Sequence, residues 1–186
     1  MAVAATDRRI ERTRQAVAGA FNALILEGRR YDRITIADLI ARAGVGRSTF
    51  YEHYRSKDDV LAETIRHPFA MLAAAVDADM QVATLREVLT HFYENRSQAK
   101  LIFVGRARRK IARVLASMIE ERLRLRAHAH GAAAPATLGI AAVAIAEGQL
   151  AAIMAWLAGE IAADAARLAT ALHRIAQASA SDLCDR

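Results

Sequence analysis

Residues 35–57 read TIADLIARAGVGRSTFYEHYRSK, and this stretch decides the fold of the N-terminal part of the chain. Thr35 stands three residues before Asp38, which is the spacing of a capping box at the start of a helix. The apolar residues that follow recur at helical spacing. The pattern predicts a short helix over 36–43.

A tight turn is predicted to separate that helix from the next. Gly44 has no Cβ and adopts a positive φ without penalty, so two helices can meet through a short turn at this point. The next helix is predicted to begin at Arg47 and to run to about Tyr54. Two short helices joined in this way form a helix-turn-helix, whose second helix can enter the major groove of DNA.

The second helix of this motif carries side chains that suit DNA. Arg47 can donate two hydrogen bonds to a guanine edge or can hold a phosphate, and Ser48 and Thr49 can contact bases or phosphates. Tyr51 and His53 suit phosphate oxygens through a hydroxyl and a ring N–H. Lys57 is predicted at the start of the following helix, where its charge adds to the positive helix N-terminus.

The pattern G-V-x-x-S-T-F-Y-x-H-Y-x-S-K resembles the DNA-binding signature of the tetracycline-repressor (TetR/AcrR) family, and the resemblance covers roughly residues 9–61. It implies that Phe50 and Tyr54 pack the recognition helix against the first helix. Gly46 departs from the family pattern, which usually has serine or a similar cap there, and weakens the cap by a few tenths of a kcal/mol. The residues that the resemblance and the chemistry together assign to DNA are Thr35, Arg47, Ser48, Thr49, Tyr51, His53 and Lys57.

The rest of the chain also has helical periodicity. An apolar stripe predicts a first helix over 7–27, with Gly28 at its C-terminal end. A long helix should begin near Ser56 and bend at Pro68. This helix is expected to be the only continuous connection between the N-terminal DNA-binding part and the C-terminal part of the chain. The remaining predicted helices span 84–95, 97–104, 106–128, 136–159 and 163–183, with a loop over 130–136.

These patterns predict an all-α protein with two parts. Residues 1–62 are expected to form a three-helix, helix-turn-helix DNA-binding domain. Residues 63–186 are expected to form a helical ligand-binding and dimerisation domain, joined to the first by the long helix. Family resemblance fades after about Ala62, as a ligand-sensing domain would show if ligands differ between members.

Composition indicates a cytoplasmic location. The formal net charge of +6 permits a polyanionic partner. The single cysteine, Cys184, excludes an intrachain disulfide and fits a reducing compartment. The longest apolar stretch, 140–157, is interrupted by Glu147 and is mostly alanine, so a membrane span is not expected. No secretory signal is recognisable.

Large or polar groups on otherwise apolar helices are candidates for an effector pocket, because such pockets are mostly apolar with a few placed polar groups. Each of them could equally be a plain core residue. These candidates are Met71, His91, Phe92, Phe103, Met118 and Trp156.

The two last helices carry stripes that favour a dimer. Small residues on the penultimate helix allow a close helix approach, and the family pairs two such helices per subunit. The stripe on the penultimate helix comprises Ala141, Ala144, Ile145, Gly148 and Ala152. The stripe on the last helix comprises Leu168, Ala171, Leu172 and Ile175.

A second nucleic-acid surface, a metal site and an enzyme active site are only weakly indicated by the sequence. The basic run 106–110 is interpreted as a solvated helix face. His128 and His130 are two residues apart and make poor joint metal ligands, so neither a metal nor a cofactor is expected. No phosphate loop or activated nucleophile is recognisable, which makes an enzyme a weak hypothesis.

The sequence thus predicts a ligand-responsive transcriptional regulator, most simply a repressor. Its expected partners are double-stranded operator DNA of palindromic sequence, a small-molecule effector and a second copy of the chain, without a membrane. Two alternatives remain open: an activator or architectural DNA binder, and a helical ligand-binding protein or enzyme that keeps the helix-turn-helix as a scaffold.

Overall fold

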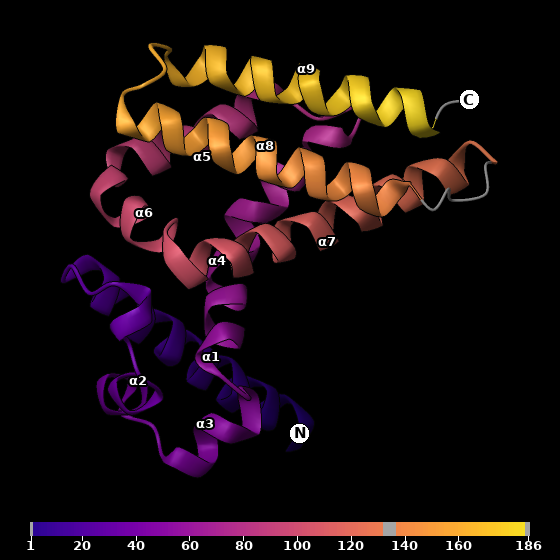
Figure 1. Ribbon diagram of the computed structural model, residues 1–186. Helices are drawn as coiled ribbons and strands as arrows, with labels where there is room; N and C mark the ends of the chain where they lie inside the picture. The colour runs from indigo at the N-terminus through magenta and orange to yellow at the C-terminus, as the bar shows by residue number, and fades with distance from the viewer. Residues whose placement is uncertain (1, 132–136, 185–186) are drawn as a thin grey trace. The chain divides into compact units, whose positions relative to one another are not determined.

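The computed structural model describes residues 2–131 and 137–184, and the described residues form helices and turns without a strand (Figure 1). In chain order the elements are α1 (Ala2–Leu26), the 3₁₀ turn η1 (Tyr31–Arg33), α2 (Ile36–Ala43), α3 (Arg47–His53), α4 (Lys57–Ala73), the 3₁₀ turn η2 (Ala74–Val76), α5 (Val82–Glu94), α6 (Arg96–Ile102), α7 (Gly105–Ala129), α8 (Leu138–Ala158) and α9 (Ala165–Cys184).

The helices pack into two compact units. The first contains the described residues up to Arg66 together with Leu101–Lys110, and the second contains His67–Lys100 and the described residues from Ile111 onward. The helices α4, α6 and α7 therefore each contribute residues to both units. The expectation that the long helix α4 is the only continuous connection is wrong, because α6 and α7 also pass from one unit to the other.

The core of the first unit forms where α1 packs on α2 and α3. Val17 and Phe21 from the apolar stripe of α1 are fully buried, as are Leu39 of α2 and Phe50 of α3. Burial of side chains of this size is worth about 1.5–3 kcal/mol each before entropy is counted. This core fixes the orientation of the two short helices, whose own length would not sustain them in isolation.

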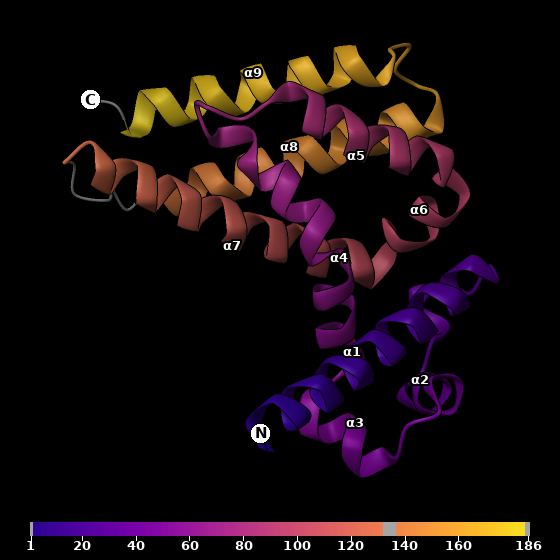
Figure 2. The same ribbon diagram turned by 180° about the vertical axis from the view of Figure 1, so that it is seen from behind.

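The second unit is a helical assembly in which α9 packs against α5, α8 and η2. Figures 1 and 2 show α8 and α9 running side by side from opposite viewpoints. By length and composition alone, α8 is apolar enough to cross a membrane, and 39% of its most apolar window is buried inside the protein. A core helix of a soluble protein meets the same criterion.

Most predicted helices are confirmed, with ends shifted by one or a few residues. The helix over 36–43 is found with these bounds, and Gly28 has the positive φ expected after the first helix. The turn η1 was not predicted, and α4 continues through Pro68 to Ala73. The predicted loop over 130–136 lies mostly outside the described residues.

Candidate nucleic-acid interface

A capping box opens α2, as the sequence predicted. The Thr35 hydroxyl oxygen accepts from the Asp38 backbone N–H at 3.1 Å, and an Asp38 carboxylate oxygen accepts from the Thr35 backbone N–H at 2.8 Å. Arg29 also forms an ion pair with this carboxylate at 2.9 Å. The hydrogen bonds from Thr35, followed by Arg29, lower the pKa of Asp38 to about 2. The N-terminus of α2 is thereby fixed relative to the preceding turn.

The turn between α2 and α3 depends on Gly44. This residue has φ 64°, and its N–H donates to the Ile40 carbonyl, which ends α2. A side chain at this φ would be strained, so glycine is required here. Gly46 then precedes α3 with an ordinary φ of −71° and offers no side-chain cap. The weaker cap expected from the sequence at this position stays a prediction.

The helix α3 has one buried and one exposed side. Phe50 is fully buried, and Tyr54 immediately after the helix is 2% exposed, which confirms their predicted role in the core. The Tyr54 hydroxyl donates to Glu63 at 3.1 Å, and burial, together with this carboxylate, raises the pKa of Tyr54 well above its usual range. The helix therefore cannot rotate without breaking its core contacts.

The opposite side of α3 presents most of the predicted DNA contacts to solvent. Arg47 and Ser48 are exposed, Tyr51 is 45% exposed, and Thr49 and His53 are partly exposed. The Arg47 guanidinium lies 5.7 Å from the centre of the Tyr51 ring, one helical turn away. Cation, hydroxyl and phenol groups thus share one accessible helix face.

The side chain of Lys57 forms hydrogen bonds and an aromatic contact within the first unit. Its ammonium donates to the carbonyls of Tyr31 at 3.0 Å and Ile34 at 2.8 Å, and it lies 4.5 Å from the centre of the Tyr31 ring. An ammonium has three N–H donors, so one remains after these two hydrogen bonds. These carbonyl contacts could not be predicted from local sequence patterns, because they join residues more than 20 positions apart.

A second set of contacts ties η1 to α4 and α7. The Tyr31 hydroxyl donates a short hydrogen bond to Asp58, and Lys110 of α7 lies 3.9 Å from the same carboxylate. Gly105, the first residue of α7, has φ 62°, and a Cβ built there would lie 2.8 Å from a carboxylate oxygen of Asp32. The predicted solvated basic run therefore includes one lysine with a specific partner.

The six pocket candidates do not form one cluster. Phe103 belongs to the first unit, whereas the other five belong to the second. Within the second unit, Phe92 and Trp156 are buried, but His91 is exposed. Met71 and Met118 are partly exposed. The structure thus places His91 at the surface, since its ring lies on the solvent side of α5.

The predicted dimer stripes divide into buried and exposed residues. Three of them, Ile145, Leu168 and Leu172, are buried within the chain. The exposed members are Ala144, Gly148, Ala171 and Ile175, with Ala141 and Ala152 partly exposed. The exposed face also includes two large apolar residues that the sequence prediction missed, Ile140 at 72% and Val143 at 55% exposed.

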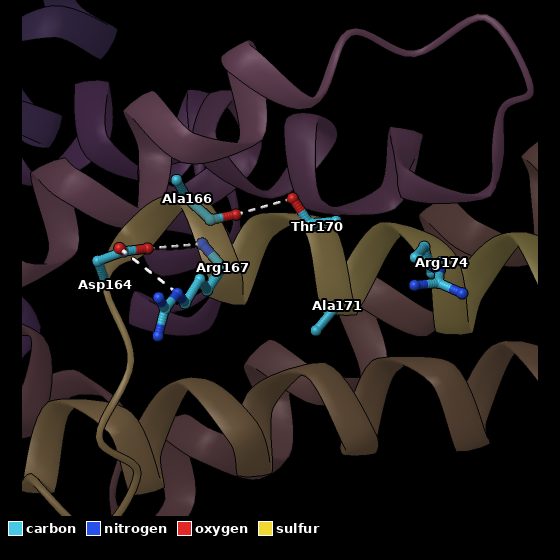
Figure 3. Close-up of a pocket in the computed structure, with 6 residues that line it drawn as sticks. All are labelled: Asp164, Ala166, Arg167, Thr170, Ala171 and Arg174. Atoms are coloured by element: carbon cyan, nitrogen blue, oxygen red, sulfur yellow. Dashed lines mark hydrogen bonds and ion pairs between the residues drawn. The ribbon is translucent and has the colours of Figure 1, made fainter.

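A shallow groove runs along the exposed side of α9. Figure 3 shows its lining residues, Asp164, Ala166, Arg167, Thr170, Ala171 and Arg174. Asp164 accepts from the Arg167 backbone N–H at 2.7 Å and so caps the helix. A second shallow groove continues along α9 and is lined by Ala171, Arg174, Ile175 and Ala178. Both grooves are lined in part by alanine.

No group of three His, Cys, Asp or Glu side chains within residues 2–131 and 137–184 is arranged to hold a metal ion. One buried polar residue, Gln149 of α8, was missed as a candidate by sequence reasoning, which treated it only as an interruption of an apolar stretch. A glutamine among alanines and leucines was the available signal.

Comparison with known proteins agrees with this geometry. Residues 19–64 match the sequence family described as bacterial regulatory proteins, tetR family. These residues contain α2, α3 and the first turns of α4. An HTH-type transcriptional regulator of Bacillus subtilis (strain 168), YxbF, is 39% identical over 64 residues, which are 34% of this chain and 17% of that relative. The chain thus matches less than a fifth of the relative's length.

The similarity in three dimensions extends over nearly the whole chain. A TetR transcriptional regulator from Streptococcus agalactiae 2603V superposes with a TM-score of 0.58 at 25% sequence identity, covering 94% of this chain and 98% of that structure. The second unit therefore shares a fold with a known regulator, even though its sequence lacks a recognisable motif.

Proposed function

We propose that this chain is a transcriptional regulator of the TetR family, and that it is a repressor that binds a palindromic operator as a dimer and is released by a small molecule. The proposal is supported by the exposed face of α3, where Arg47, Ser48 and Tyr51 are accessible while Phe50 is buried behind them. That arrangement is what insertion into a major groove requires.

We assign individual roles to the residues of the interface. Arg47 is proposed to read a base edge, with Ser48 and Thr49 beside it, because they form the first turn of the recognition helix. Tyr51 and His53 are proposed to hold phosphates. Thr35 at the start of α2, and Lys57 through its remaining N–H, are proposed to contact the DNA backbone.

Dimerisation is proposed to use the exposed side of α8 and α9. An apolar surface containing Ile140, Val143 and Ile175 is costly to leave in water. The adjoining small residues Ala144 and Gly148 let a partner helix approach closely. A two-fold axis through this surface would present two recognition helices, which explains why the operator should be palindromic.

The effector is proposed to bind in the second unit, where Met71, Phe92, Met118 and Trp156 are the remaining candidates. Residues 63–186 serve as the sensing domain and residues 1–62 as the DNA-binding domain. Since α4 and α7 contribute to both units, a ligand that alters either helix can change the affinity for DNA. A coupling of about 5- to 150-fold is typical of such systems. We also propose a cytoplasmic location and a regulatory, non-catalytic role, as is usual for regulators of this family.

A gel-shift titration tests the proposed function. The full chain is mixed with the promoter region upstream of its own gene, and binding is measured at several salt concentrations against an unrelated duplex of equal length. We expect specific binding whose logarithmic affinity falls linearly with the logarithm of salt. Equal affinity for both duplexes would contradict the proposed function.

A further inference from the structure

The described part of the second unit buries one polar side chain in its core, the amide of Gln149 on α8, which is 3% exposed. Its Nε2 donates to the carbonyl of Leu72 at 3.2 Å. No donor among the described residues reaches its Oε1. Buried polar atoms are nearly always hydrogen-bonded, so an acceptor left in this state calls for a partner.

The orientation of the amide follows from its neighbour. The Leu72 group that it meets is a carbonyl, which accepts and cannot donate. Exchanging the two ends of the amide would bring two acceptor oxygens together and leave the NH₂ group unpaired. The atom without a partner is therefore the acceptor, and any group that completes the site must be a hydrogen-bond donor.

The position of Gln149 connects it to α4, one of the helices that contribute residues to both units. Leu72 lies in the last turn of α4, directly before η2. The Gln149 amide therefore holds the C-terminal part of α4 through one hydrogen bond. A molecule bound to its other end would act on the side chain that holds this helix end.

The surrounding helices are suited to an uncharged, apolar molecule. The same helices α4, α5 and α8 carry two aromatic pairs, Phe69 with Phe92 at 6.1 Å and Tyr93 with Trp156 at 5.0 Å between ring centres. No charged side chain is buried in the described core. A charged ligand would lose its hydration without a counter-charge, which is costly.

We propose that Gln149 is the polar anchor of the effector site, and that the effector is a neutral, largely apolar molecule with one hydroxyl or N–H group that donates to Oε1. The inference rests on the proposed function, in that it assumes an effector. It names the residue that recognises this molecule and the chemical class to which the molecule belongs.

The intrinsic fluorescence of the protein provides a direct test. Trp156 is the only tryptophan in the sequence and lies seven residues after Gln149, on the same side of α8. The probes are three matched pairs of an alcohol and its methyl ether, with propyl, cyclohexyl and phenyl groups. The ether keeps the apolar part and loses the donor. Each probe is titrated into the full chain without DNA.

Wild-type protein should bind at least one alcohol saturably and should prefer it over its ether by about tenfold, the value of one neutral hydrogen bond to a buried acceptor. Gln149→Met should abolish this preference while binding the ether about as well as wild type does. Gln81→Met is the matched control, because Gln81 is exposed in the same unit and makes no side-chain cap. It should retain the preference.

Two results would overturn the inference. One is that none of the three alcohols binds saturably. The other is a donor preference that survives in Gln149→Met, since the hydroxyl would then donate to an acceptor other than Oε1. If circular dichroism shows that Gln149→Met is unfolded, Gln149→Leu takes its place. The preference of wild-type protein for an alcohol over its methyl ether tests the inference whichever variant is used. A gel shift on the same preparations separates this inference from the proposed function. If wild type binds DNA specifically but shows no donor preference, only this inference is refuted. If wild type does not bind DNA specifically, the proposed function is refuted.

Discussion

The hydroxyl of Tyr31, in the turn after α1, donates a hydrogen bond to the carboxylate of Asp58, in the first turn of α4. The two residues are 27 positions apart, and the ring of Tyr31 also carries the ammonium of Lys57 on its face. The buried phenol of Tyr31 therefore connects the start of α4 to η1, the turn that precedes α2. This arrangement determines how the first unit responds to alkaline pH.

Stability should fall at high pH because of this phenol. Burial, followed by the hydrogen bond to Asp58, raises the pKa of Tyr31 well above its usual range, and burial also raises the pKa of Tyr54. The unfolded chain therefore loses these protons from about pH 10, while the folded chain keeps them, so the stabilisation is present below that pH and is lost above it. Urea unfolding as a function of pH measures the effect.

The matched variant is Tyr31→Phe. It should cost about 1–3 kcal/mol near neutral pH, as expected for a hydrogen bond to a charged acceptor, and it should flatten the decline in stability above about pH 10. Tyr93→Phe, at a tyrosine that is 47% exposed, serves as the control and should leave the decline unchanged. Parallel curves for wild type and Tyr31→Phe would show that this phenol does not set the alkaline response.

Gly46→Ser should stabilise the first unit. The backbone at Gly46 has an ordinary N-cap conformation, and a Cβ there would meet only the hydroxyl of Thr49 at 3.6 Å and that of Ser48 at 3.9 Å. A serine hydroxyl can accept from an unpaired N–H of α3, for a gain of a few tenths of a kcal/mol. Thermal unfolding measures the gain, and Gly46→Ala separates the cap from the added methyl group. A lower stability of Gly46→Ser than of Gly46→Ala would refute the capping argument.

Tyr51→Phe and Lys57→Ala should weaken DNA binding with different side effects. Tyr51 is 45% exposed, so loss of its hydroxyl should lower affinity for all sequences without a change in stability. Lys57→Ala removes two hydrogen bonds to carbonyls within the first unit and should therefore also lower stability, and it should reduce the salt slope by about one. A stable Lys57→Ala protein with the wild-type slope would remove Lys57 from the interface.

Ile175→Glu should convert the proposed dimer to a monomer. The side chain is 64% exposed on the grooved face of α9, where two copies would bring two buried carboxylates together. Leu125→Glu is the control, because Leu125 is 61% exposed on α7, outside the proposed interface. Sedimentation of both variants and of wild type measures whether each protein is a monomer or a dimer. An Ile175→Glu protein that sediments as wild type does would place the interface elsewhere.

Local chemistry explains what the sequence could predict. The bounds of α2 depend on Thr35, Asp38 and Gly44, all within the helix or next to it, and helix caps are local signals. The buried side of α3 was likewise predictable, because the family resemblance assigned Phe50 and Tyr54 to the contact with the first helix.

Contacts between distant residues explain what the sequence could not predict. The Lys57 ammonium is held by Ile34, 23 positions away, and Gln149 meets Leu72, 77 positions away. The burial of the α9 stripe could not be predicted for the same reason. Leu168 and Ile175 are both apolar, but packing against other helices buries Leu168 and leaves Ile175 in solvent.

The exposed face of α3 is proposed to read operator DNA, and selection of bound duplexes from a random pool is the direct test of this role. Wild type should select a palindromic consensus, and Arg47→Ala, whose side chain is exposed at the start of α3, should lose about 1–3 kcal/mol on that consensus and relax the preference at one base step in each half-site. Failure of wild type to enrich any sequence would contradict the claim, and an unchanged consensus with Arg47→Ala would contradict base reading by that residue.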